Sequence, residues 1–151
     1  MGRAADLAAA DSLPVGRLHL RAHPVVLGLV GDDPDRACGY HNRPPYPRLV
    51  LRHTPSGSDR GLLWLMEQVL QLEAYGDPDL STGDDVLRAL LYAGLGALAE
   101  LPDLPQPLAP GLAVVTNVGS RGSGGPSYEP TGQPRWVGTL AMSVHPPHPT
   151  D

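Results

Sequence analysis

Histidines spaced like metal ligands are the first residues in this chain whose types could do chemistry. His19 and His23 are four positions apart, so a helix would place both on one face. The zinc-binding pattern His-Glu-x-x-His needs an intervening glutamate, and this chain has Leu20-Arg21 between its histidines. A second pair, His145 and His148, flanks two prolines near the end. Neither pair has cysteine or carboxylate partners in register, so we predict solvated or helix-capping histidines and no metal site.

Two other candidate chemical groups also have simple interpretations. Cys38 is the only cysteine, which excludes an internal disulfide, and its place beside a glycine favours an incidental thiol over a nucleophile. The segment Gly119–Gly125 resembles a phosphate-binding loop in its glycine content, but it lacks the Gly-Lys-Ser/Thr ending and a following helix. We predict a mobile hairpin loop here, in which Arg121 could become ordered against a neighbouring subunit.

Four aspartates cluster in the middle of the chain, at Asp77, Asp79, Asp84 and Asp85. The calcium-binding Asp-x-Asp-x-Asp-Gly register is not met, and no glutamate follows at position twelve. Turn and helix-cap chemistry explains them better. No Gly-x-Ser-x-Gly elbow and no paired carboxylates on facing elements occur either. The sequence therefore predicts no catalytic residue, no cofactor and no enzymatic activity.

Composition sets limits on the partners of the protein. The chain has 151 residues, of which 41% are hydrophobic and 18% charged, with a formal net charge of −5. This is enough for one domain with a hydrophobic core, which we place at residues 1–147 with a flexible tail at 148–151. The absence of a basic cluster argues against general binding to nucleic-acid phosphates. No apolar stretch has the ~20 residues that a membrane span needs.

The clearest strand covers residues 135–145. Its apolar positions alternate, with Trp136, Gly138, Leu140, Met142 and Val144 on one face, and two prolines end it. Residues 67–75 fit either helical or alternating spacing, and we predict a strand because Gly76-Asp-Pro-Asp follows at once.

The remaining elements are predicted from hydrophobic periodicity and from the glycine and proline residues that end helices and strands. We predict two N-terminal helices, a long amphipathic helix opened by a capping box of Ser81 and Asp84, and two more strands. Val25 to Val30 fits a last helical turn or an extended segment. The expected ranges are helices 3–10, 14–22 and 81–101, a loop at 31–47, strands 48–53 and 112–118, and a polar turn at 54–61. Together they predict a two-layer α+β fold, with about four mixed or antiparallel strands and the long helix packed on one face.

A group of aromatic and charged residues near the end is the best candidate for a contact surface. Tyr128, Glu129, Arg135 and Trp136 are close in sequence, and Arg121 shortly precedes them. Aromatic residues and arginine are enriched at the centres of interfaces. The alternative for Trp136 is ordinary sheet core.

Three stretches together resemble the tail terminator proteins of long-tailed phages, especially phages of actinobacteria. They are Pro44 to Arg52, a strand entered through Pro-Pro-Tyr; Val69 to Gly76 followed by the helix through Leu101; and Tyr128 to Val137, continuing to Pro146. The resemblance covers roughly residues 10–147, and the order and spacing of these motifs carry it.

The resemblance implies a small α+β subunit that assembles into a ring, of six copies in that family, at the head-proximal end of the tail tube in the virion. Its partners would be further copies of itself, the major tail tube protein and the neck or head-closure protein. DNA would only pass through the lumen, and no membrane is implied. Alternatives are a head-closure or neck connector subunit and a small ligand-binding or enzymatic α+β domain.

Overall fold

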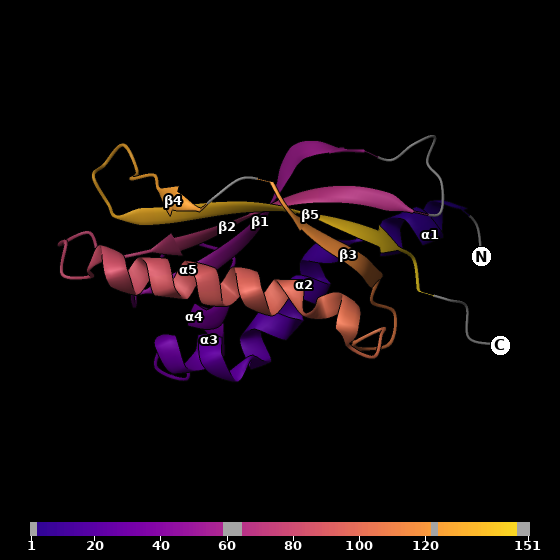
Figure 1. Cartoon of the computed structure of the whole chain (residues 1–151), viewed down its shortest axis with the longest axis horizontal. Helices are drawn as coiled ribbons and strands as arrows, with labels where there is room; N and C mark the ends of the chain where they lie inside the picture. The colour runs from indigo at the N-terminus through magenta and orange to yellow at the C-terminus, as the bar shows by residue number, and fades with distance from the viewer. Residues whose placement is uncertain (1–2, 59–64, 122–123, 148–151) are drawn as a thin grey trace.

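One sheet and one layer of helices organise the chain. The computed structural model describes residues 3–58, 65–121 and 124–147. Its helices are α1 (Arg3–Ala9), α2 (Ser12–Ala22), α3 (Pro24–Leu29), α4 (Pro34–Ala37), α5 (Asp84–Ala99) and the 3₁₀ turn η2 (Leu101–Asp103). Its strands are β1 (Arg48–Ser58), β2 (Met66–Tyr75), β3 (Val114–Ser120), β4 (Gly125–Pro126) and β5 (Arg135–His145) (Figure 1).

The described strands form an open antiparallel sheet in the order β1-β2-β5-β3. The two-residue strand β4 is a fifth member. It pairs with Trp136 and Val137 near the beginning of β5, whereas β3 pairs only with residues 140–145 of that strand. The predicted α+β class is therefore confirmed, with one short strand more than expected. The named strands pair antiparallel, and a single parallel bridge joins Gly39 to Val50 of β1.

Both strands at the centre of the sheet agree with the sequence. β5 spans 135–145 as predicted, and β2 confirms that residues 67–75 are a strand. Leu70 and Leu72 of β2 are fully buried, and so are Met142 and Val144 of β5. Burial against the helices explains why strand pairing prevails over the helical propensity of this segment.

The helices α2 and α5 pack on one side of the sheet, and α3 packs against these two helices on the same side (Figure 1). Close approach depends on glycine: a Cβ at Gly94 of α5 would lie 2.7 Å from Leu72 Cδ2, and one at Gly16 of α2 would lie 2.9 Å from Leu51 Cδ2. Helices α2 and α3 thus extend the layer begun by α5 on the same side of the sheet (Figure 1).

The predicted capping box is wrong. The N-cap of α5 is Gly83, without a side-chain bond, and the helix begins at Asp84. The Ser81 backbone N–H is bound by the Asp79 carboxylate at 2.8 Å, within a turn that places Leu80 at a φ of 65°. Asp84 accepts hydrogen bonds from two aromatic side chains instead of capping the helix.

Strand β1 is longer than predicted. It continues to Ser58, through the segment that we expected to be a polar turn, because the pairing with β2 resumes at Gly57 after a register shift beyond His53. This part of β1 rises above the plane of the sheet (Figure 1).

Three other boundaries also differ from the expectation. The expected loop at 31–47 contains α4, which the Asp33 side chain caps. Strand β3 begins and ends two residues later than predicted, so it extends into the segment that we expected to be a mobile loop. Residues 25–30, for which two conformations fitted, belong mostly to helix α3.

Candidate assembly surface

The face of the sheet opposite the helices is the broadest candidate surface, and we call it the open face. Alternate residues of the paired strands point to it, and their composition contrasts with the leucines on the helix side. Ionisable groups lie toward its two ends, with small or β-branched residues between them. Its members in β1, β2 and β5 are Val50, Arg52, Glu67, Val69, Gln71, Glu73, Tyr75, Arg135, Val137, Thr139, Ala141 and Ser143.

Glu73 is the centre of an ion-pair cluster on the open face. Its carboxylate, 3% exposed, pairs with the Arg52 guanidinium on β1 and lies 3.0 Å from Arg135 Nη1 on β5. The same Arg135 nitrogen donates to Glu129 Oε1 at 3.0 Å. The Tyr75 hydroxyl lies 3.0 Å from Glu73 and 3.2 Å from Glu129. Two arginines and a phenol thus satisfy the buried carboxylate, as a charge in this environment requires.

The hydrogen bonds of this cluster hold parts of the chain together. Burial raises the pKa of the Tyr75 phenol above its ordinary value, so the group remains a neutral donor to the neighbouring carboxylates. Arg135 also donates from Nε to the Ser127 carbonyl at 2.7 Å. Together these bonds fix the loop after β4 to the sheet.

Tyr128 and Trp136, both predicted contact residues, converge on the beginning of α5. The Tyr128 hydroxyl donates to Asp84 Oδ1 at 2.8 Å, and Trp136 Nε1 donates to the same oxygen at 3.3 Å. Trp136 is half-buried against the core, whereas Tyr128 remains 47% exposed. Trp136 therefore has at least a packing role.

The structure brings four of the five predicted contact residues to one end of the sheet and places the fifth elsewhere. Tyr128, Glu129, Arg135 and Trp136 gather around the beginning of β5, as described above. Arg121 follows β3, and its guanidinium pairs with Glu67 on the open face, where both side chains are partly exposed. The alternation of residues 69–75 places Glu73 with Gln71 on this face, but sequence reasoning did not select Glu73 as a candidate contact residue.

The other chemical candidates are now located. Cys38 is buried, which raises the pKa of its thiol to about 11, so the thiol stays protonated and unreactive near neutral pH. Asp77 and Asp79 bind backbone N–H groups two residues ahead, which confirms turn chemistry. His145 Nδ1 lies 2.7 Å from the Pro146 carbonyl, and His148 is outside the described residues.

His23 caps α3, as predicted for a histidine at this position, since Nδ1 accepts from the Val25 N–H at 3.3 Å. The expectation that the His19–His23 pair has no carboxylate partner is wrong. Glu100, at the C-cap of α5, lies beside both imidazoles.

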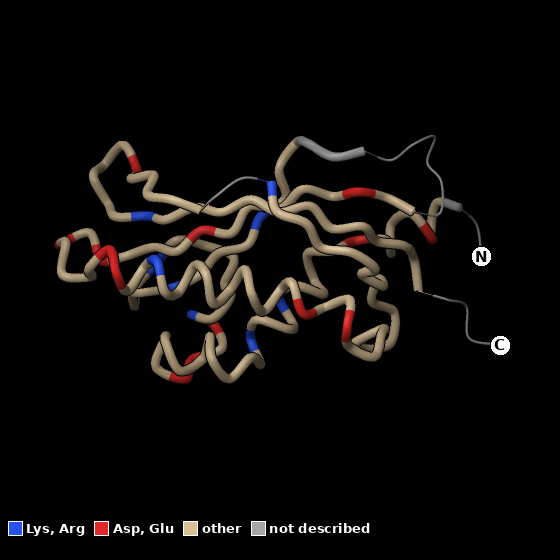
Figure 2. The backbone as a smooth tube through the Cα atoms, in the orientation of Figure 1, with Lys and Arg blue, Asp and Glu red and all other residues tan. Residues whose placement is uncertain are grey.

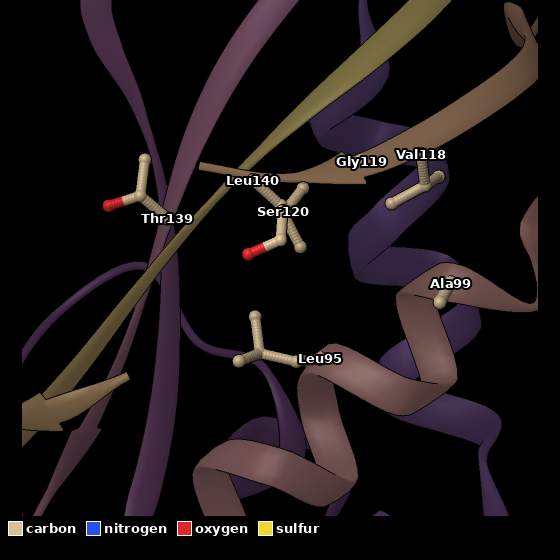
Figure 3. A pocket seen from close by; sticks show the side chains of 7 residues that line it. All are labelled: Leu95, Ala99, Val118, Gly119, Ser120, Thr139 and Leu140. Carbon is tan, nitrogen blue, oxygen red and sulfur yellow. The ribbon is translucent and has the colours of Figure 1, made fainter. Parts of the chain in front are cut away.

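A small cavity of about 130 Å³ opens between α5 and the junction of β3 with β5. Figure 3 shows Leu95 and Thr139 among the side chains around it. The other lining residues are Ala99, Val118, Gly119, Ser120 and Leu140, so no histidine or aspartate reaches this cavity. It could receive a small apolar group, but its lining supplies no acid, base or thiol.

Charge is dispersed over the part of the chain that the structure describes. Arginine and acidic positions are interspersed along the backbone (Figure 2). Several arginines of the first third serve internal contacts: Arg43 and Arg48 pair with Asp35, and the Arg17 guanidinium lies 3.3 Å above the Tyr40 ring. A concentrated phosphate-binding patch from these residues therefore has little support.

No described helix has the length and apolarity to cross a membrane. No known protein family matches the chain, and no curated protein matches it.

Proposed function

We propose that this chain is the repeating subunit of a ring that ends a phage tail tube and joins it to the neck, as the resemblance of its motifs implies. The observation that carries the proposal is the one-sided architecture. The helices α2 and α5 pack on one face of the sheet with α3 against them, and the charges on the other face are paired within the chain. Such a face can be covered by another subunit without leaving an unpaired charge buried.

Ring closure needs two different patches that meet head to tail. The open face is the first patch. For the second, we propose the apolar side chains Leu18, Val25 and Leu29 on α2 and α3, which are 42%, 58% and 36% exposed. The helix layer that carries them lies on the opposite side of the sheet from the open face (Figure 1). Two patches on opposite sides suit an arrangement in which each copy contacts the next.

The charge of the chain is compatible with a ring around DNA. Six copies, each with a formal charge of −5, would form an acidic ring, and a lumen of this sign would let the phosphate backbone pass without adhering. Binding of the tube protein and the neck protein would use the two rims of the ring.

The test is co-assembly with a major tail tube protein, whose gene we expect immediately downstream of the gene for this chain. We expect electron microscopy to show a ring of this protein on one end of each tube, and tube growth to stop when the protein is added. Tubes that grow to the same length with the protein and carry no ring would contradict the proposal. A ring that binds a portal complex and leaves tube growth unchanged would instead identify a neck connector.

A matched pair of variants tests the second patch. Val25→Asp places a carboxylate in the first turn of α3, where the helix dipole favours it, so folding should be retained while ring closure fails. Val86→Asp makes the same change in the first turn of α5 at a 38% exposed valine, and should assemble normally. Light scattering of the assembled protein compares them, and normal assembly of Val25→Asp would reject the α2–α3 patch.

A further inference from the structure

Two imidazoles and a carboxylate converge where α2 and α5 end. His19 lies in the last turn of α2, His23 is its C-cap, and Glu100 is the C-cap of α5. Glu100 Oε2 lies 3.5 Å from His19 Nε2 and 3.1 Å from His23 Nε2. One potential ligand atom from each of the three residues lies within 4.8 Å of the others. The C-terminal part of α5 runs beside α2 in Figure 1.

From this geometry we infer that His19, His23 and Glu100 form a site for a divalent transition-metal ion of the zinc class. Two imidazole nitrogens and one carboxylate oxygen are a ligand set that zinc accepts, with its fourth position left to water. Ligands about 2.0–2.2 Å from a tetrahedral zinc ion lie roughly 3.5 Å from one another, and the two nitrogen-to-oxygen distances are already in this range. Small side-chain movements would therefore complete the site.

The bonding of His19 supports a ligand between these groups. Its Nε2 atom is buried and makes no hydrogen bond, although it lies within ion-pair distance of Glu100. At 3.5 Å the Glu100 oxygen attracts this nitrogen electrostatically without forming a hydrogen bond with it, and buried polar atoms seldom remain unsatisfied. A metal ion between the three side chains would satisfy this nitrogen.

The surroundings also favour a cation. Both α2 and α5 end here, and a helix C-terminus carries partial negative charge. Within α5, which is described in full, no basic residue lies in the last turn to offset that charge. The imidazoles are only 15% and 13% exposed, whereas Glu100 is 52% exposed, so an ion could enter from the Glu100 side.

Metal binding has one identifiable cost. His23 Nδ1 accepts a hydrogen bond from the Val25 N–H at 3.3 Å, which assigns the proton of the neutral ring to Nε2. Coordination of the neutral ring through Nε2 requires the other tautomer, in which the proton lies on Nδ1. The long Val25 bond is then lost, which is a small loss for a bond of this length.

The site would join the N-terminal helices to α5. Binding of a metal ion at this site would stabilise the folded state, because the unfolded chain does not hold the three ligands together. The consequence is a helix layer whose stability depends on metal, independently of whether the chain forms a ring.

The experiment uses the full chain without a histidine tag, freed of metal with a chelator. Zinc alone is titrated by calorimetry, and cobalt is used as a spectroscopic substitute. We expect one zinc ion per chain, cobalt absorption typical of four or five ligands, and an unfolding midpoint that rises with zinc concentration. Absence of saturable zinc binding would overturn the proposal.

Three variants separate this site from the other histidines. Changing an outer-shell partner costs ~10–100-fold in metal affinity, so His23→Gln and Glu100→Gln should each weaken zinc binding at least ~10-fold. The exposed carboxylate makes Glu100→Gln safe for folding, which circular dichroism checks. His41→Gln, at an exposed histidine outside the cluster, should bind zinc as the wild type does. Equal affinity in the wild type and Glu100→Gln would reject the assignment.

Discussion

The two faces of the sheet are built from the same strands but obey different physical requirements. On the helix face, Leu49, Leu70, Leu72 and Met142 are fully buried under α5 and its neighbours. On the open face, charged residues pair with one another, around Glu73 at one end and between Glu67 and Arg121 at the other. Val69 and Ala141 on this face are also buried. The period of two along each strand keeps these two sets separate.

The two faces therefore have different roles: the helix face stabilises the fold, and the open face is the proposed assembly surface. Apolar burial on the helix face supplies the main stabilisation, since each buried leucine contributes about 1.5–3 kcal/mol. The open face contributes mainly through hydrogen-bonded ion pairs, whose net effect on stability is smaller. Of its remaining side chains, Gln71, Val137, Thr139 and Ser143 are partly exposed and could serve contacts between subunits. Val50, Val69 and Ala141 are already buried within the chain.

The largest expected effect comes from a matched pair on β2. Leu72→Ala removes a fully buried side chain from the helix face and should lower the free energy of unfolding by about 2–5 kcal/mol. Gln71→Ala, one position away on the open face, should change it by less than about 1 kcal/mol. Denaturant unfolding measures both, and similar losses at the two positions would break the distinction between the faces.

The ion-pair cluster should be the exception on the open face. Glu73→Gln removes the buried charge that Arg52 and Arg135 share and should cost about 3 kcal/mol, the lower end for breaking a buried pair, because Arg52 is half-exposed. Glu67→Gln disrupts the exposed pair with Arg121 and should cost less than about 1 kcal/mol. Equal losses of unfolding free energy for the two variants in urea would show that the buried Glu73 cluster stabilises the fold no more than an exposed ion pair does.

Two glycines of α5 should respond with opposite signs. An added methyl at Gly94 would lie 2.7 Å from Leu72 Cδ2 and 3.0 Å from Leu49 Cδ1, so Gly94→Ala should destabilise by about 1–3 kcal/mol. Gly96 is exposed, with nothing within 4 Å of such a methyl. Gly96→Ala should therefore stabilise the helix by about 1 kcal/mol. Thermal unfolding that moves in the same direction for both variants would contradict the close packing of α5 on the sheet.

The elements with strong periodicity could be predicted from the sequence. The alternation of β5 gave its range and its buried face, because one face had to be apolar and two prolines ended the strand. Small residues on the apolar face of a helix allow close approach to a sheet, and Gly94 makes such a contact in α5. By contrast, the polar and glycine-containing end of β1 has local signals of a turn, and only its pairing with β2 makes it a strand.

The candidate sites depend on relations that no single segment contains. Glu73 meets Arg52 and Arg135 only through the register of three strands. Glu100 meets His23 across 77 positions of sequence, because α2 and α5 end together. Arg121, Tyr128, Glu129, Arg135 and Trp136 could be chosen by residue type, but their internal partners follow from tertiary structure.

The most direct test of the open face as an assembly surface is a substitution with the smallest expected effect on stability. Thr139 pairs with Gln71 of β2, and its carbonyl accepts a hydrogen bond from the Arg121 N–H. Thr139→Glu should change the free energy of unfolding by only about 0.5 kcal/mol. Ala89→Glu, at an exposed position of α5, serves as the control. The measurement is the length distribution of tail tubes grown with each variant, read by electron microscopy. We predict uncapped, overlong tubes with Thr139→Glu and normal capped tubes with Ala89→Glu. Tubes of normal length capped by a folded Thr139→Glu protein would contradict the claim that the open face joins neighbouring subunits.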